Sequence, residues 1–214
     1  MLVNHFVVIN VITVKKESGP FQNYKEKTME NTKKVGVLFS GGVESTLILY
    51  EAMLKYDNVY ALSESGGDRY HITSTIINKL ENLTGKKIQK HILMIFDFEI
   101  IDNKQVTKEP LQNVYRRYLI KNNIDIVYAG TNKFYEELPE LGGPRKDLRS
   151  NIVKMPYWDM YKHEVMEKYY KYGIQHLIKY CVSCTHHRKD FTCGKCYDCK
   201  ERKIAETRLD KKTL

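Results

Sequence analysis

The sequence predicts an α/β fold in which helices flank a parallel sheet and a small helical, zinc-binding region follows. Three observations lead to this prediction. Short apolar runs alternate with helical stretches over residues 35–129, which is typical of parallel sheets. A glycine-rich loop joins the first run to the first helix, and four cysteines cluster near the C-terminus. At 214 residues and 42% hydrophobic content, the chain can form one well-packed domain with a small appendage.

Residues 1–34 are expected to be an extension made of a strand and a linker. Residues 1–14 are β-branched and apolar and lack the basic leader of a signal peptide. Residues 15–34 are polar and contain glycine and proline, which favours a linker. The α/β domain is then expected over residues 35–160, and the helical zinc-binding region over residues 161–214.

The elements of the α/β domain follow from the spacing of its apolar residues. Strands are expected at residues 35–39, 59–62, 91–96 and 124–129, and helices at residues 46–56, 72–83 and 111–122. Residues 131–152 are rich in proline, glycine and charge and are expected to be a loop, and loops of this length often carry function. A helix over residues 161–172 and a further short helix precede the cysteines.

The loop after the first strand has the composition of an anion-binding site. It reads Ser40-Gly41-Gly42-Val43-Glu44-Ser45-Thr46 and opens the first helix. Glycines let backbone N–H groups approach an oxyanion, serines offer hydroxyl donors, and the helix N-terminus adds a positive dipole end. Such loops lie where open parallel sheets bind ligands, so a nucleotide pyrophosphate is the expected guest. There is no Gly-Lys-Ser/Thr, which excludes a Walker loop, and the competing interpretation is a plain strand-to-helix turn.

The cysteine cluster predicts a structural zinc site. Its expected ligands are Cys184, Cys193, Cys196 and Cys199. Each Cys-x-x-Cys turn presents two sulfurs to one ion, and Gly194 allows the tight bend between them. A site saturated by four sulfurs has no open position for water, so this metal should stabilise the fold and not take part in chemistry.

Alternatives to that ligand set remain open. The cysteines could pair as disulfides or form a redox Cys-x-x-Cys, although four in one short stretch fit a metal better. Cys181 could replace Cys184, and His186 or His187 could enter the site. Metal-bound cysteines indicate a reducing cytoplasm, and no apolar run is long enough to span a bilayer.

The formal net charge of +9 indicates an anionic partner only weakly. Four thiolates and one zinc ion would reduce it to roughly +7. The densest basic stretch, residues 188–212, is interleaved with acids, which are Asp190, Asp198, Glu201, Glu206 and Asp210. This pattern favours a solvated face over a nucleic-acid or nucleotide surface, so nucleic acid is a possible but not a required partner.

Together the loop and the cysteines resemble the PP-loop ATP pyrophosphatases, most closely the 7-cyano-7-deazaguanine synthase family. The resemblance runs from Val35 to about Arg208. That family has a Ser-Gly-Gly-x-Asp-Ser loop and the same cysteine spacing, followed by arginine as at Arg202. The resemblance implies an adenine nucleotide alpha hydrolase-like, Rossmann-like fold with the zinc region packed on the same domain.

The resemblance also implies an activity. Members of the family bind ATP, adenylate the carboxylate of 7-carboxy-7-deazaguanine, let ammonia displace AMP, then activate the amide again and eliminate to the nitrile. The chain would then be an ATP-dependent carbon–nitrogen ligase of queuosine biosynthesis that uses Mg²⁺ and supplies 7-deazaguanine modification of tRNA or DNA. A homodimer is expected because dimers are common in the family.

Residue roles are carried over by position. The residues expected to bind the nucleotide are Ser40, Gly41, Gly42, Val43, Ser45, Thr46, Arg69, Gly130 and Asn132. Arg69 stands in Gly67-Asp68-Arg69, which resembles the family's Gly-Gln-Arg, and Asn132 stands in its Gly-x-Asn. Glu44 takes the place of the family's aspartate and would act on magnesium, directly or through water. Lys162, in a Lys-x-Glu with Glu164, would neutralise phosphate charge as the acyl-adenylate forms, unless it is a solvated helix lysine.

Departures from the family lie on the expected substrate side. Ser65 and Thr73 replace an aspartate and a glutamate, Phe134 and Tyr135 replace an acidic residue, and Gly143-Pro144-Arg145 replaces Tyr-Pro-Asp. Two other functions therefore stay open. One is a PP-loop ATPase that adenylates another acceptor, in tRNA thiolation or on another carboxylate, and the other is a nucleotide-binding protein with impaired catalysis.

Overall fold

The computed structural model describes residues 32–65, 69–101, 104–138, 147–184 and 192–213. Within these ranges only the backbone is described for Arg69, residues 98–107, Leu111 and residues 211–213. Several predictions fall outside the described residues, namely the extension before residue 32, Gly67-Asp68, Gly143-Pro144-Arg145, and the two histidines after Cys184.

The described chain alternates strands and helices up to β3, continues with β4 and β5 before α3 and β6, and is helical after β7. The strands are β1 (Lys34–Leu38), β2 (Asn58–Glu64), β3 (Lys90–Met94), β4 (Phe98–Ile101), β5 (Lys104–Thr107), β6 (Ile126–Ala129) and β7 (Val153–Lys154). The helices are α1 (Val43–Lys55), α2 (Arg69–Thr84), α3 (Leu111–Asn122), α4 (Lys162–Lys171), the 3-10 helix η2 (Gln175–Tyr180) and α5 (Tyr197–Thr213).

Five strands form a parallel sheet in the order β3-β2-β1-β6-β7. β1 lies at its centre, with Val37 opposite Ala61 of β2 on one side and Tyr128 of β6 on the other. This confirms the expected α/β fold with a Rossmann-like parallel sheet. The sheet order reverses beside β1, because β2 and β3 follow on one side and β6 on the other.

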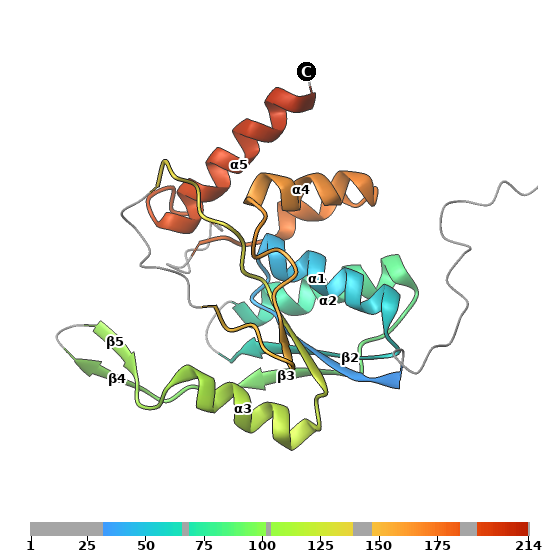
Figure 1. The fold of residues 1–214 in the computed structure, drawn as a ribbon, viewed down its shortest axis with the longest axis vertical. Coiled ribbons are helices and arrows are strands. Elements are labelled where there is room, and N and C mark those ends of the chain that lie inside the picture. Colours follow the sequence, from blue (N-terminus) through green and yellow to red (C-terminus); the bar gives the residue numbers. More distant parts are fainter. Residues whose placement is uncertain (1–31, 66–68, 102–103, 139–146, 185–191, 214) are drawn as a thin grey trace, which may run out of the picture.

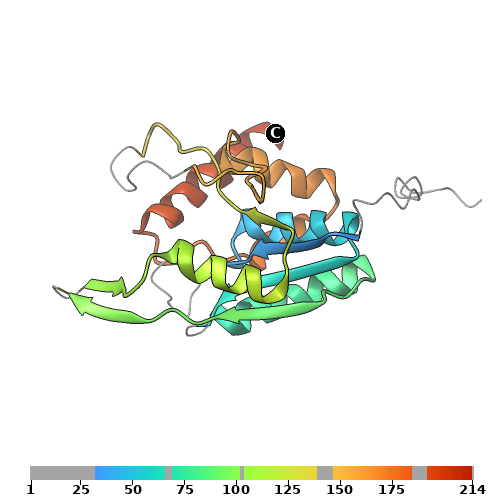
Figure 2. The same cartoon turned by 60° about the horizontal axis from the view of Figure 1, so that its bottom comes forward.

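Helices cover both faces of the sheet. α1 and α2 lie on one face and α3 on the other, while α4 lies over α1 and α5 extends away from the sheet (Figures 1 and 2). The larger core cluster joins strand residues such as Val37 to Leu47 of α1, Met166 of α4 and Leu209 of α5. The C-terminal helices therefore share the hydrophobic core of the sheet.

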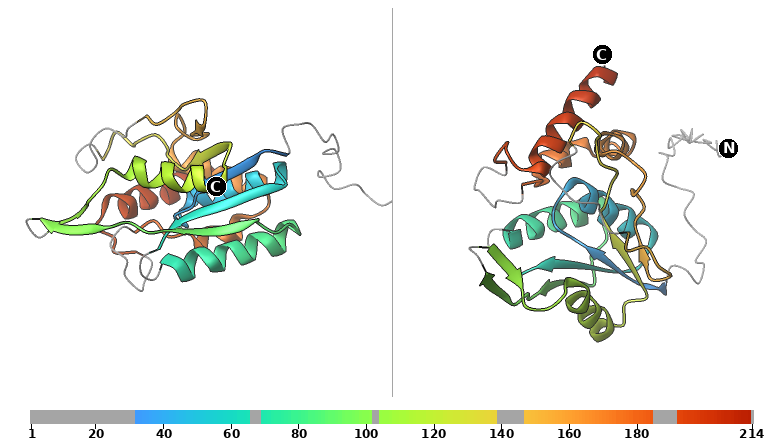
Figure 3. Two further views of the ribbon diagram at one scale, coloured as in Figure 1. Left: turned by 90° about the horizontal axis from the view of Figure 1, so that it is seen from below. Right: turned by 60° about the vertical axis from the view of Figure 1, so that its left-hand side comes forward.

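Some elements were not expected from the sequence. β4 and β5 form an antiparallel hairpin that projects from the body beside α3 (Figure 3). β7 adds an edge strand, and α1 begins at Val43, three residues before the predicted start. Among the described residues, every helix is too short or too polar to span a bilayer.

Candidate active site

The glycine-rich loop connects the end of β1 to the first turn of α1. Gly41 has a φ of +76°, a left-handed conformation that disfavours any side chain. The Gly42 N–H donates to Ser40 Oγ at 3.3 Å, and the Ser45 hydroxyl donates to the Gly42 carbonyl at 3.2 Å. The hydroxyls of Ser40 and Ser45 lie 3.2 Å apart, so the loop gathers two hydroxyl groups and a helix N-terminus.

The end of β6 lies directly against this loop. An added Cβ on Gly130 would lie 2.9 Å from the backbone nitrogen of Ser45 and 3.0 Å from Cβ of Glu44. Only glycine permits that approach. Because β1 and β6 flank the point where the sheet order reverses, the loop and Gly130 lie at the edge where open α/β sheets bind ligands.

A buried ion cluster lies behind the loop. Nζ of Lys162 is 2.7 Å from Oε1 of Glu44 and 3.0 Å from Oε2 of Glu201, and all three residues are buried. Burial by itself lowers the pKa of Lys162, but the two carboxylates outweigh it and raise the pKa above its ordinary value. Lys162 is thus a charged ammonium, and its interpretation as a solvated helix lysine is wrong.

Asn132 and Glu201 complete the cluster. Nδ2 of Asn132 donates to Oε1 of Glu201 at 3.0 Å, and both residues are buried. The prediction that the charges of residues 188–212 form a solvated face is wrong at Glu201, which has 0% exposure. Glu201 is the member of the cluster that the sequence analysis did not assign to the site. Its nearest signal is its position two residues after Cys199.

The other residues predicted to bind nucleotide lie at different depths. Val43 and Thr46 are fully buried in α1, and the Val43 carbonyl accepts a hydrogen bond from the Tyr169 hydroxyl at 2.6 Å. Their side chains are buried, whereas Ser40 is exposed. Arg69 begins α2, and its side chain lies outside the described part. Glu164 caps α4, because its Oε2 accepts from the Tyr161 N–H at 2.7 Å.

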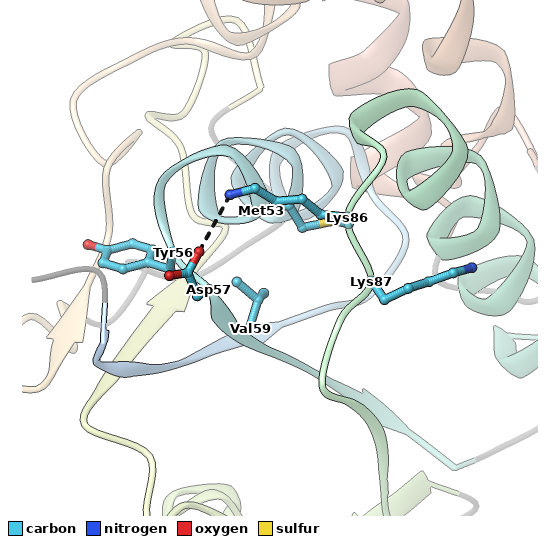
Figure 4. A pocket seen from close by; sticks show the side chains of 6 residues that line it. All are labelled: Met53, Tyr56, Asp57, Val59, Lys86 and Lys87. Atoms are coloured by element: carbon cyan, nitrogen blue, oxygen red, sulfur yellow. Dashed lines mark ion pairs between the residues drawn. The ribbon is translucent and has the colours of Figure 1, made fainter. Parts of the chain in front are cut away.

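A separate hollow of about 230 Å³ lies at the opposite edge of the sheet (Figure 4). Its lining residues come from the end of α1, the turn into β2, the start of β2 and the segment between α2 and β3, namely Met53, Tyr56, Asp57, Val59, Lys86 and Lys87. None of them belongs to the predicted site. Because the amino ends of parallel strands meet at this edge, the hollow lies away from the ligand-binding edge.

The four predicted cysteines come together in a cluster that could hold a metal ion, which we call the metal centre. The sulfurs of Cys184, Cys193, Cys196 and Cys199 all lie within 4.8 Å of one another. A tetrahedral zinc ion with Zn–S bonds of about 2.3 Å requires S···S distances of roughly 3.8 Å, and Cys193 and Cys199 are 3.9 Å apart. The sulfur arrangement therefore fits zinc. Gly194 adopts the expected bend, with a φ of +68°.

Backbone groups already favour a thiolate at this centre. The N–H groups of Cys196 and Lys195 donate to Sγ of Cys193 at 3.3 and 3.4 Å and lower the pKa of this thiol to about 6. Cys181 lies outside the cluster, buried beside Tyr169, and its replacement of Cys184 as a ligand is not what the structure shows. Burial raises the pKa of the Cys181 thiol.

Replacing Cys193 with serine is expected to remove most of the bound zinc, because the site loses one of its four ligands. We expect a loss of about 2 kcal/mol in the free energy of unfolding, which lowers the Tm of a chain of this size by about 4–8 °C. Metal content per chain and thermal unfolding measure the two effects. Cys181→Ser is the matched control and should keep its zinc. Full zinc content in C193S would contradict the ligand assignment.

Comparison with known proteins adds three findings. A family model described as "Queuosine biosynthesis protein QueC" matches residues 34–141, just over half of the chain. None of the curated proteins compared with the chain matches it. One similar solved structure is an NH3-dependent NAD synthetase from Campylobacter jejuni in complex with nitrate. The two chains are 17% identical, and the matched region covers 84% of this chain and 85% of the synthetase chain. The TM-score is 0.44, so the two structures are only distantly alike.

Proposed function

Because this chain belongs to the QueC family, we propose that it converts 7-carboxy-7-deazaguanine and ammonia to 7-cyano-7-deazaguanine in an ATP-dependent reaction, for 7-deazaguanine modification of tRNA or DNA. Membership of this family supports an ATP-dependent adenylating enzyme of ligase type. The observation that carries the proposal is the family match over residues 34–141, since this range contains both the glycine-rich loop and Asn132.

In the proposed reaction the substrate carboxylate attacks the α-phosphorus of ATP. A carboxylate oxygen–phosphorus bond forms, the α–β phosphoanhydride bond breaks, and pyrophosphate leaves. The loop would hold the departing pyrophosphate through its backbone N–H groups, the hydroxyls of Ser40 and Ser45, and the N-terminus of α1. Ammonia then displaces AMP to give the amide, and a second adenylation of the amide oxygen precedes loss of AMP to the nitrile.

Lys162 would stabilise the negative charge that develops on the phosphate. Its ammonium is fixed behind the loop by Glu44 and Glu201 and is charged at neutral pH, because both carboxylates raise its pKa. A preorganised cation in a buried site is worth more than the same charge in water.

Glu44 is the residue that would hold magnesium. Its Oε2 lies 3.7 Å from the place that a Cβ on Gly42 would take, so the carboxylate faces the glycine-rich loop. A carboxylate beside phosphates suits this ion, which neutralises phosphate charge when bound.

Replacing Glu44 with aspartate tests how the site has adapted to the longer side chain. Because the ion pair to Lys162 spans 2.7 Å, removing one methylene should separate Glu44 from the ammonium, and we expect turnover to fall about tenfold or more. Steady-state AMP formation measures this. An increase in turnover would mean that the glutamate is a handicap.

The proposed activity is tested by mixing the zinc-loaded protein with magnesium, ATP, ammonium and 7-carboxy-7-deazaguanine and following AMP and the deazapurine by mass spectrometry. Nitrile together with AMP is the expected result. AMP without nitrile would point to another acceptor. Tight ATP binding without either product would point to a nucleotide-binding protein with impaired catalysis.

The second candidate function is adenylation of a different acceptor. Departures from the family on the expected substrate side favour it. Thr73, where the family has a glutamate, is fully buried and donates its hydroxyl to the Tyr70 carbonyl at 3.0 Å, so it offers no charge to a substrate. Phe134 and Tyr135 stand where the family has an acidic residue shortly after its Gly-x-Asn, and Tyr135 is buried in an aromatic cluster. Its ring stacks on Tyr161, its hydroxyl lies 2.8 Å from Nδ1 of His163, and burial raises its pKa to about 12. An aromatic cluster thus replaces an acidic group.

A further inference from the structure

Glu201 connects the cysteine cluster to the ion cluster behind the loop. It lies two residues after Cys199 in the first turns of α5 and has no exposed surface. One carboxylate oxygen contacts Lys162 at 3.0 Å and the other accepts from Asn132 at 3.0 Å. Asn132 follows β6 and Lys162 begins α4, so Glu201 contacts two separate segments of the chain at once.

The segment just before Cys184, which we call the first arm of the cysteine cluster, contacts the glycine-rich loop directly. The Val182 N–H, two residues before Cys184, donates to the Gly41 carbonyl at 2.8 Å. An ion bound by Cys184 and Cys199 would tie this arm to the start of α5. The metal centre therefore lies between Val182, which donates to the loop, and Glu201, which contacts Lys162.

We propose that Glu201 is a positioning residue through which the metal centre holds Lys162 and Asn132 in place for the nucleotide, so that zinc and ATP binding are coupled. This inference rests on the proposed function only in assuming that the loop binds ATP. Glu201 would act through Lys162, because it would remain a partner of Lys162 if the Glu44 carboxylate held a magnesium ion.

Glu201→Gln in the full-length, zinc-loaded protein tests the positioning role. Lys162 keeps its 2.7 Å partner Glu44, so the variant should fold with unchanged zinc content. Its Tm should fall, because a glutamine offers one acceptor oxygen to the two donors, Lys162 and Asn132, that Glu201 serves. We expect its Kd for magnesium-ATP, measured by titration calorimetry, to rise about fivefold or more, within the range of typical coupling energies. Glu201→Asp, which restores the charge, should recover part of the affinity.

The sign of the effect separates positioning from charge alone. Removing a carboxylate beside a polyanion would by itself tighten ATP binding, because it removes repulsion. Asp210→Asn makes the same charge change at an exposed position of α5 and should leave the Kd unchanged. Equal or tighter ATP binding by E201Q overturns the positioning role.

Reciprocity tests the coupling to the metal. If zinc favours ATP binding, ATP must favour zinc retention by the same factor. Zinc transfer to a chromophoric chelator is therefore expected to need about fivefold more chelator when magnesium-ATP is present, in the wild type and in D210N but not in E201Q. Equal transfer with and without ATP in the wild type overturns the coupling. A wild-type protein that does not bind ATP at all would instead contradict the proposed function.

Discussion

Replacing Lys162 with methionine is expected to lower AMP formation at least about a hundredfold, because a buried cation that stabilises developing phosphate charge typically contributes this much. The same change should destabilise the fold by about 3–5 kcal/mol, since it leaves Glu44 and Glu201 buried without their shared cation. Single-turnover AMP release and urea unfolding measure the two effects separately.

The double variant K162M/E201Q separates stability from activity. Neutralising one of the two carboxylates should restore part of the lost free energy of unfolding, because the remaining buried charge is smaller. AMP formation should stay low, since the ammonium is still missing. Recovery of activity in the double variant would show that Lys162 affects the reaction only through stability.

Replacing Gly130 with alanine is expected to raise the Kd for ATP tenfold or more and to cost about 1–3 kcal/mol of stability, as overpacking commonly does. The added Cβ would lie 2.9 Å from the backbone nitrogen of Ser45, and a helix backbone cannot yield as a side chain does. The first turn of α1 must therefore move away from β6, which separates the groups that would bind phosphate. ATP titration and thermal unfolding measure the two effects.

Gly36→Ala is the matched control for that variant. Its Cβ would lie 2.9 Å from Cδ1 of Leu62 and 3.1 Å from Cγ2 of Ile124, which are ends of side chains inside the sheet. It should cost less stability than G130A, because the ends of side chains can shift, and it should leave the ATP affinity of the folded protein unchanged. A loss of affinity as large as that of G130A would mean that the effect is not specific to the loop.

Local patterns were enough to predict the central sheet and the cysteine centre. Strands β1, β2 and β3 are short apolar runs between polar turns, and α3 was placed at its observed residues because its apolar spacing is regular. The clustering of the four cysteines could be predicted because the short Cys-x-x-Cys spacings bring their sulfurs close together. The glycine-rich loop was also predicted. The start of α1 was placed too late, because the polar residues Glu44 and Ser45 occupy its first turn and interrupt the apolar pattern.

The ion cluster could not be predicted, because it depends on the packing of distant segments. Glu201, Ala205 and Leu209 are spaced by four residues and form the buried face of α5. A glutamate at one of these positions, among many other charges, gives no sign of burial, since buried charges are recognised only from their partners. The β4–β5 hairpin was missed although Asp and Asn, which favour turns, separate its two runs, because each run is only four residues long.

The strand order also determines when the site can form during synthesis. β1 and β2 can pair once residue 64 has been made, but the other edge of β1 must wait for β6, which begins at residue 126. Pairings between strands so far apart in sequence form slowly. The partners of Lys162 are separated further still, because Glu44 is among the first described residues and Glu201 among the last. A nascent chain therefore carries an incomplete ion cluster until α5 has been made, and Lys162 gains both of its buried partners only at that late stage.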